Sequence, residues 1–407
     1  MKIVFVNRFF YPDTSATSQM LSDLAFDLAS DHEVHVIAST LEYDAPDARL
    51  PPREQVQRVS VHRVWTSGFG RNALAGRTID YLTFYLSATL RLLRLVRRGD
   101  IVVAMTDPPL ISVPAALVTA LKRGRLVNWL HDLFPEIAGE LDFKRAARGI
   151  GGALAWCRDR SLAAAACNVV LGDVMATKVA SRAIPDNTIR VIHNWACGEQ
   201  IRPLAPALNP LRREWGLDGK FVVGYSGNMG RAHDFSALIA AARQLAARRD
   251  IVFLLIGGGK QRPELEAAVH AQRLTNVMFR PFQSRDALGH SLTVPDCHVV
   301  SLRPALEGLI VPSKLYSSLA AGRPVIFLGA RDGEVGRLLT EGPPFGLQVA
   351  TDDVAGLVRA IEQLQSDPAR AGALGVAGRR LFEQRFDKPV AVAKWRALIA
   401  AASPSAR

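Results

Sequence analysis

Short apolar segments alternate with amphipathic segments along most of the chain. Residues 2–7 and 33–39 have the pattern of strands, whereas the apolar positions of residues 18–29 recur at helical spacing. A strand, a helix and a second strand in this order form a βαβ unit, which implies a parallel sheet with a right-handed crossover. The same criteria predict strands at 60–66, 100–106, 125–132, the end of 163–171, 188–194, 220–227, 251–257, 277–282, 297–302 and 324–329, and helices at 79–96, after Pro114, and at 234–249, 263–272, 284–292, 313–321, 355–384 and 389–402.

The alternation is interrupted between residues 199 and 216. This segment holds Pro203, Pro206 and Pro210 and is typical of a linker. We therefore predict an α/β fold with two doubly wound domains, residues 1–198 and residues 199–385, and a last helix within 386–407 that packs back on the first domain. Ligands of such sheets bind at the carboxyl ends of the strands, so the loops that follow strands are the candidate site.

Composition places the chain among ordinary globular proteins. Of its 407 residues, 49% are hydrophobic and 22% are charged, which excludes a disordered, collagenous or coiled-coil protein. The cysteines form no C-x-x-C pair, so we expect neither a disulfide framework nor a thiolate metal site. The start of the chain does not resemble a signal peptide, and the apolar segment 81–96 is too short to span a membrane. We expect a cytoplasmic protein.

The net charge of +12, from 50 basic and 38 acidic residues, favours anionic partners. Basic residues are spread along the chain without interleaved aromatic residues, so we do not expect nucleic acid as a partner. The apolar segment 81–98 carries or adjoins several arginines: Arg71, Arg77, Arg91, Arg94, Arg97 and Arg98. This segment is either a peripheral surface that rests on an anionic membrane, at the inner face of the plasma membrane, or a long packed helix with a charged end.

The stretch 301–329 carries the most chemical information. A predicted strand ends in a loop with Glu307, and Pro312, Ser313 and Lys314 then open a helix that closes at Gly322. Ser313 is a good N-cap residue, and a helix start beside a lysine attracts an anion such as a diphosphate. The alternative is an ordinary helix cap next to a solvated lysine.

Six motifs follow one another along nearly the whole chain: FFYPDTSATS, TDPPL, WLHDLFPE, VIHNW, GYSGNMG and EGLIVPSKLYSSLAAGRPVI. In this order and spacing they resemble the retaining glycosyltransferases of family 4, and within them the WbuB-like transferases of bacterial O-antigen, capsule and exopolysaccharide assembly. The resemblance implies the GT-B fold, in which two Rossmann-like domains face a cleft. It implies transfer of a sugar from a nucleotide-diphosphate donor, with a UDP-linked N-acetylhexosamine favoured here, to a lipid-linked saccharide acceptor.

The resemblance also gives roles to residues of the second domain. Glu307 matches the first glutamate of the family's E-x7-E motif, which lies beside the donor sugar. Ser317 stands where the second glutamate binds the ribose, so ribose recognition departs from the family pattern. Many members read G-R-L-x-x-x-K after the first strand of this domain, and Asn228 and His233 replace the arginine and the lysine here.

The diphosphate contacts then fall to Arg231 and Lys314. The other positions that the resemblance places around the donor are Gly227, Gly230, Gly257, Phe282, Val311, Pro312 and Ser313. Two of these assignments have alternatives, because SGNMG also fits a plain tight turn and Phe282 also fits a core aromatic residue.

In the first domain, Ser15, Ala16 and Thr17 replace the Gly-Gly that many family members have near the donor phosphate and the acceptor. Small side chains preserve close approach, and the alternative is a helix N-cap. His131, at the end of a predicted strand, is expected to bind the sugar or position the acceptor. Asp107 and Glu136 are acceptor-side candidates, although Asp107 before two prolines also fits a turn.

The candidate catalytic residues are therefore His131, Glu307, Lys314 and Arg231. The sequence has no D-x-D motif, so we expect no divalent metal and no cofactor beyond the donor. The resemblance implies retention of the anomeric configuration, with the leaving phosphate helping to deprotonate the acceptor. Two alternatives stay open: a sugar-nucleotide epimerase or hydrolase of the same fold, and a non-catalytic partner that binds sugar nucleotides.

Overall fold

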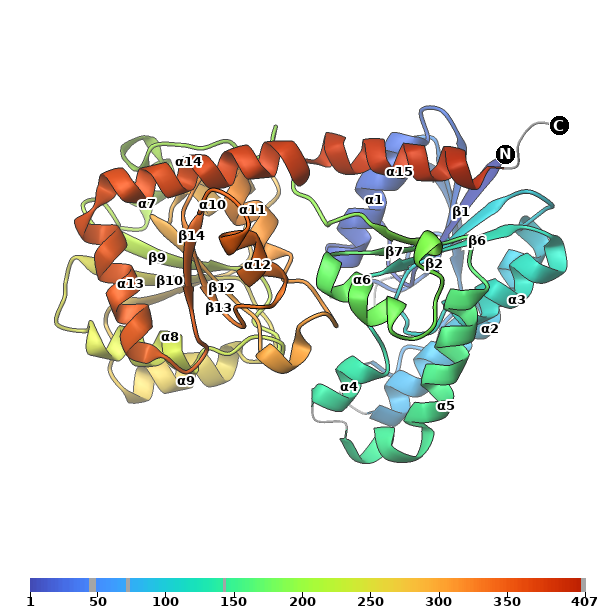
Figure 1. Cartoon of the computed structure of the whole chain (residues 1–407), viewed down its shortest axis with the longest axis horizontal. Helices are drawn as coiled ribbons and strands as arrows, with labels where there is room; N and C mark the ends of the chain where they lie inside the picture. Colours follow the sequence, from blue (N-terminus) through green and yellow to red (C-terminus); the bar gives the residue numbers. More distant parts are fainter. Residues whose placement is uncertain (44–48, 71–73, 142–143, 404–407) are drawn as a thin grey trace. The chain divides into compact units, whose positions relative to one another are not determined.

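The computed structural model describes residues 1–43, 49–70, 74–141 and 144–403, with only the backbone described for residues 74 and 144–150. The chain forms two compact units (Figure 1). The first contains residues 1–192 together with the chain from Val392 on, and the second contains His193–Ala391. Both are built on parallel sheets, and the predicted fold class of two doubly wound α/β domains is confirmed.

In the described part of the first unit, eight strands lie in the order β3-β4-β2-β1-β5-β6-β7-β8. All neighbours pair in parallel except β3 and β4, which are antiparallel. The strands are β1 (Lys2–Val6), β2 (Glu33–Ser39), β3 (Arg53–Val56), β4 (Val59–Val64), β5 (Ile101–Ala104), β6 (Arg125–Leu130), β7 (Cys167–Val170) and β8 (Ile189–Val191), and the helices are α1 (Ala16–Leu28), α2 (Leu74–Leu95), α3 (Ser112–Lys122), α4 (Glu136–Glu140), α5 (Lys144–Ala163) and α6 (Asp173–Ala180). The winding direction reverses between β1 and β5, which makes their carboxyl ends the switch point of this sheet.

Helices α2 and α3 cover one face of this sheet. Phe84, Ala88 and Leu92 lie one turn apart on α2 and are buried in the same cluster as Ile111 and Ala115 near the start of α3. Because residues four apart share a helix face, the opposite faces of both helices point away from the sheet.

In the second unit, the described strands form a parallel sheet in the order β11-β10-β9-β12-β13-β14. The strands are β9 (Phe221–Ser226), β10 (Ile251–Ile256), β11 (Val277–Arg280), β12 (Cys297–Ser301), β13 (Val325–Leu328) and β14 (Gly346–Val349), and the helices are α7 (Pro210–Glu214), α8 (Ser236–Gln244), α9 (Arg262–Ala271), α10 (Leu288–Thr293), α11 (Lys314–Ala320), α12 (Glu334–Thr340), α13 (Val354–Ser366) and α14 (Pro368–Arg385). Successive residues of β9 are buried on opposite faces of the sheet, Val223 in one core cluster and Val222 in the other. The switch point of this sheet lies between β9 and β12.

The expected linker at 199–216 is wrong, because this segment packs on the second unit. Pro206 and Pro210 open two helical turns, where a missing N–H costs nothing. The buried guanidinium of Arg212 donates to the carbonyl oxygen of Val294 over 2.8 Å and pairs with Asp296. Pro206 and Pro210 therefore start helical turns in a segment that is packed on the second unit.

The predicted helix at 355–384 is two helices. The side chain of Asp367 accepts a hydrogen bond from the backbone N–H of Arg370 and caps α14, which begins at Pro368. The last helix, α15 (Lys388–Ala402), belongs to the first unit from Val392 on. There the buried ring of Trp395 packs on Trp129 of β6, with the ring centroids 4.7 Å apart.

Candidate functional site

The topology gathers the candidate residues of each unit at the carboxyl edge of its sheet. In the second unit, Gly227 follows β9 and Arg303 follows β12, the two strands at the switch point. In the first unit, Ser15 follows β1, Asp107 follows β5 and His131 follows the neighbouring strand β6. Each unit therefore presents its candidates where doubly wound sheets bind ligands.

Two glycine-containing loops of the second unit are joined through their backbones. The N–H of Gly227 donates to the carbonyl oxygen of Ile256 over 2.9 Å, and the N–H of Met229 donates to that of Gly258 over 2.6 Å. Gly257 has a φ of +131°, and a Cβ there would overlap the carbonyl group of Gly227. The SGNMG segment is thus half of a two-loop structure, which the alternative of a plain tight turn does not describe.

Phe282 lies beside these loops with its ring against Gly257 and Gly258. Its side chain is 62% exposed, so the alternative of a core aromatic residue is wrong. An exposed ring on a glycine turn offers a flat apolar face to a planar group.

Lys314 crosses from the start of α11 to the loop after β9. Its Nζ lies 2.8 Å from Nε2 of His233 and 5.0 Å from the centroid of the Tyr225 ring, and its aliphatic stem passes over Gly227. A Cβ on Gly227 would come within 2.9 Å of Cε of Lys314, so the glycine makes room for the lysine. Two residues that the sequence assigned to one anion, Gly227 and Lys314, are therefore in contact.

The electrostatics of this contact follow from burial. Burial lowers the pKa of Lys314 to about 7. Burial first, and then the charges of Lys314 and Arg303, lower the pKa of His233 to about 3, so the imidazole is neutral. Nδ1 of His233 lies 2.5 Å from the carbonyl oxygen of Ser301, to which it donates, which leaves Nε2 to accept from the ammonium group.

The start of α11 differs in detail from the expected cap. Ser313 stands at the N-cap position, but it has helical dihedral angles and its hydroxyl makes no capping bond with the described residues. The N–H groups of the second and third helical residues, Leu315 and Tyr316, donate to the carbonyl oxygens of Pro312 and Ser313. Lys314 adds a full positive charge at this helix start. Val311 and Pro312 are buried beneath it.

The hydroxyl of Ser317 donates to the carbonyl oxygen of Lys314 over 3.1 Å, and Ser318 donates to the same oxygen over 2.8 Å. Because the hydroxyl proton of Ser317 is used in this hydrogen bond, the hydroxyl oxygen can only accept a hydrogen bond from a ligand. A glutamate at this position would offer two acceptor oxygens, so the departure from the family motif is a real loss of hydrogen-bonding capacity.

Glu307 lies against the start of α12, a helix that sequence reasoning did not predict. Its Oε2 accepts a hydrogen bond from the backbone N–H of Glu334 over 3.2 Å, and its carboxylate occupies the space where Gly333 would carry a side chain. Glu307 therefore anchors this helix start. A ligand hydroxyl would share a carboxylate that is already held in place.

The loop after β1 is organised by the buried carboxylate of Asp13. It accepts hydrogen bonds from the backbone N–H groups of Ser15 over 2.8 Å and Tyr43 over 2.5 Å. Ser15 precedes α1 in extended conformation, but its hydroxyl does not cap the helix and is shielded from solvent without a hydrogen-bond partner among the described residues. The N-cap alternative is therefore wrong for the side chain of Ser15. Ala16 and Thr17 are the first residues of α1.

His131 and Asp132 follow β6. Burial lowers the pKa of His131 to about 3, and its Nε2 is shielded without a partner in the described part of the chain. Burial and the nearby charge of Asp107 raise the pKa of Asp132 to about 7. This edge of the first sheet therefore combines a neutral imidazole with a carboxyl group that changes charge near neutral pH.

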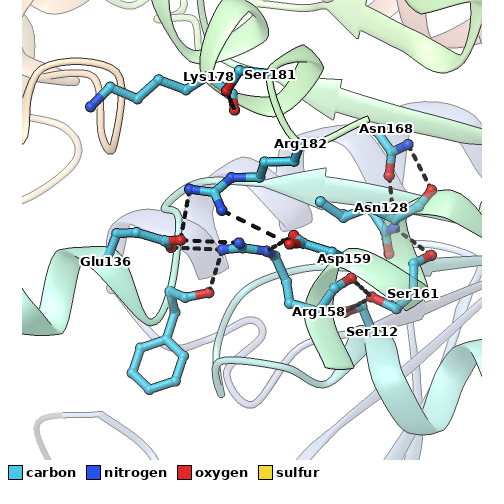
Figure 2. A network of polar contacts seen from close by, with 12 residues as sticks. Ser112, Asn128, Glu136, Arg158, Asp159, Ser161, Asn168, Lys178, Ser181 and Arg182 are labelled. Carbon is cyan, nitrogen blue, oxygen red and sulfur yellow. Dashed lines mark hydrogen bonds and ion pairs between the residues drawn. The ribbon is translucent and has the colours of Figure 1, made fainter. Parts of the chain in front are cut away.

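Glu136 has a structural partner instead of a free carboxylate. Figure 2 shows the guanidinium of Arg158 between Glu136 and Asp159, and Arg182 beside them. Arg158 donates to both oxygens of Glu136, over 2.7 and 3.0 Å, and to the carbonyl oxygen of Phe134 over 2.7 Å. This network fixes the chain from Phe134 to Glu136, where α4 begins, so Glu136 has a structural role.

Arg231 is exposed in the loop after β9. Sequence reasoning gave no role to Tyr225, whose ring faces the Lys314 ammonium, or to Asp132. A strand-end position was the available signal for both. Among the described residues, no three His, Cys, Asp or Glu side chains are grouped to hold a metal ion, and no helix combines the length and apolarity needed to cross a bilayer. Arg71 lies outside the described residues.

Two family models match the chain, a glycosyl transferase 4-like domain at residues 16–195 and glycosyl transferases group 1 at residues 220–367. The chain is 29% identical over 290 residues, 69% of each protein, to the putative colanic acid biosynthesis glycosyl transferase WcaI of Escherichia coli, and 25% identical over 340 residues, 81% of each protein, to the probable glycosyltransferase WbjE of Pseudomonas aeruginosa. The crystal structure of HepE from Anabaena with UDP and glucose aligns with a TM-score of 0.74 at 16% identity, over 98% of this chain and all of that one. WaaG, a glycosyltransferase of lipopolysaccharide biosynthesis, aligns with a TM-score of 0.71 at 13% identity, over 98% of this chain and 99% of that one.

We expect Arg158→Ala to lower the free energy of unfolding of the first unit by about 3 kcal/mol, because the substitution removes both Arg158 hydrogen bonds of Glu136, which keeps only Arg182, and the hydrogen bond to the Phe134 carbonyl oxygen. Arg182→Ala is the matched control, since Arg182 also pairs with Glu136 but is more exposed; we expect a loss of about 1 kcal/mol or less. Urea unfolding measures both. Equal losses for the two variants would contradict the structural role given to Arg158.

Lys314→Met is expected to stabilise the ligand-free protein at pH 6. The folded-state pKa of about 7 lies below the unfolded value of 10.5, so the unfolded state binds more protons between these limits and stability rises with pH. Lys314→Met removes this dependence of stability on pH. Its Tm should therefore exceed that of the wild type at pH 6, by about 2–4 °C for each kcal/mol of added stability, and the difference should shrink toward pH 10. Thermal unfolding at a series of pH values measures it, with the exposed Lys260→Met as control. A pH-independent difference from the wild type would show that folding does not lower the pKa of Lys314.

Proposed function

We propose that this chain, which belongs to the GT4-like glycosyltransferases of the GT-B fold, transfers a hexose or N-acetylhexosamine from a UDP-linked donor to a lipid-linked glycan with retention of anomeric configuration. The glycan would belong to a surface polysaccharide such as an O-antigen, a capsule or an exopolysaccharide. The relation to WcaI, named for colanic acid biosynthesis, supports the polysaccharide assignment. HepE, crystallised with UDP and with UDP-glucose, supports the donor class.

The observation that carries the proposal is the position of Lys314. Its ammonium lies at the carboxyl edge of the sheet against a neutral imidazole, and no carboxylate of the described residues pairs with it. A half-buried cation without a counter-ion is costly, and a bound diphosphate would supply the missing negative charge. Family members carry a phosphate-binding lysine after the first strand of this domain, and His233 stands at that position here. Lys314 of α11 would supply the positive charge instead, with its ammonium group bound to His233.

The other residues fit roles around such a diphosphate. The exposed ring of Phe282 would stack on the nucleotide base, Glu307 would accept hydrogen bonds from sugar hydroxyls, and Arg231 would add a second charge at the phosphates. In the first unit, Ser15 and His131 would each contribute one hydrogen bond on the acceptor side. Asp107 would lie with them at the carboxyl edge.

The reaction breaks the bond between the anomeric carbon and the diphosphate oxygen and forms the glycosidic bond on the same face of the sugar. The acceptor hydroxyl loses its proton to the leaving phosphate. Lys314 would stabilise the charge that develops on this phosphate from a position fixed before the donor binds. We propose that this chemistry needs no divalent metal. An epimerase or hydrolase would give products without an acceptor, and a non-catalytic partner would give none.

We expect Lys314→Ala to lower kcat/KM for the donor and the affinity for UDP at least tenfold, because a charged hydrogen bond contributes about 1.5–3 kcal/mol. For the wild type, the affinity for UDP should fall as the pH rises above about 7, where the free enzyme loses the Lys314 proton, by up to about tenfold per pH unit. Lys314→Arg, which stays charged, should bind UDP with little dependence on pH.

Calorimetric titration with UDP at pH 6, 7, 8 and 9 measures the affinities, and mass spectrometry of products formed from a nucleotide-sugar panel with a membrane lipid extract measures transfer. Lys260→Met is the control for the removal of a basic charge. UDP binding that is unchanged in Lys314→Ala would refute the site. Intact UDP binding without transfer to any lipid-linked acceptor would refute the acceptor class alone.

A further inference from the structure

Helix α2 turns an apolar stripe to solvent. Its strongly exposed residues from position 79 to position 90 are Ile79, Leu82, Leu86 and Leu90, with exposed fractions of 43%, 58%, 65% and 46%. They lie three or four residues apart, on the face opposite the one that packs in the core. A helix on the surface of a globular domain normally carries polar residues on this face.

The two helices next to α2 continue this surface. α3 packs beside α2, and α5 packs beside α3 (Figure 1). α3 exposes Leu117 and Leu121, at 70% and 71%, and α5 exposes Trp156 at 64%. We name the outer faces of α2, α3 and α5 the three-helix surface. Large apolar side chains on adjacent helices are typical of a surface that is covered in use.

The charges on the three-helix surface are basic. Each of the three helices precedes a strand of the parallel part of the sheet, so their last turns gather at the same edge of that sheet. The basic residues at or just after these last turns are Arg94, Arg97, Arg98, Lys122, Arg123 and Arg160. The guanidinium of Arg160 lies 5.8 Å from the ring centroid of Trp156, which joins the basic and the apolar parts.

The three helices contain two acidic residues in total, and neither opposes these arginines. Asp80 on α2 is buried and accepts hydrogen bonds from the backbone of Phe69 and Gly70. Asp159 on α5 is held by Arg158. A second copy of the chain docked through the same three helices would bring no unpaired acidic group against the basic edge. A bilayer with anionic head groups complements both parts, because its interface takes apolar side chains and attracts arginine and lysine.

We propose that the three-helix surface docks the protein on an anionic lipid bilayer, with the leucines and Trp156 at the level of the acyl chains and the basic edge at the head groups. This is a peripheral attachment, and it does not depend on the donor or on the reaction assigned above. It would hold the first unit at the place where a lipid-linked acceptor is found.

The full-length protein, without donor, is mixed with vesicles of phosphatidylcholine alone or of phosphatidylcholine with about 30% phosphatidylglycerol. Sedimentation of the vesicles measures the bound protein. We expect binding to the anionic vesicles that weakens as salt is added. A variant with Leu82→Gln, Leu86→Gln and Leu117→Gln should bind at least tenfold more weakly, as should one with Arg94→Glu and Arg97→Glu. Leu208→Gln, which changes a leucine that is 71% exposed in the second unit, should bind like the wild type.

Thermal unfolding and UDP titration of each variant show whether the protein is folded and whether its donor site is intact. Wild-type protein that fails to bind, or that binds neutral and anionic vesicles equally, would overturn the proposal. So would a dimer in gel filtration that Leu86→Gln dissociates, without any vesicle binding, since this result would assign the surface to a second copy. Vesicle binding with no UDP binding would leave this inference standing and refute the donor site instead.

Discussion

The contact of Lys314 with His233 is the interaction around which the candidate site of the second unit is built. It brings together the loop after β9, the end of β12 and the first turn of α11, and each contributes something different: a glycine that makes room, a carbonyl oxygen that orients the imidazole, and the lysine itself. Because the imidazole is neutral, the contact orients the ammonium without neutralising it. The site is therefore arranged before any anion arrives, and preorganisation of this kind is what electrostatic catalysis requires.

The parallel sheets could be predicted from the sequence because their strands are short, apolar and separated by helical periodicity, and these signals are local. One source of error is contacts between distant residues. The segment at 199–216 has the composition of a linker, but Arg212 is bound to Asp296, 84 positions further along the chain. Helix α12 is short, and β14 is a short strand at the edge of its sheet, so neither has a periodicity long enough to identify it.

The same limit applies to the site. Motifs put Gly227 in a loop after a strand and Ser15 and Lys314 at helix starts that follow strands, and the topology of a doubly wound sheet decides that these positions lie at the carboxyl edge. Motifs do not show partners. The sequence left Glu136 as an acceptor-side candidate, and only the fold reveals that Arg158 holds its carboxylate. Ser15 and Ser313 stand at N-cap positions without capping side chains, which residue type alone does not predict.

The path of α15 has a practical consequence. The helix starts among residues of the second unit and finishes in the first, where Trp395 covers Trp129 and Arg396 pairs with Asp27 of α1. A fragment that stops at residue 192 would lack this cover and expose a tryptophan at the centre of its sheet. The second unit, by contrast, is one uninterrupted piece of chain. Of the two halves, the nucleotide-binding candidate is thus the one suited to separate expression, whereas the other must be supplied with its closing helix, for instance by circular permutation.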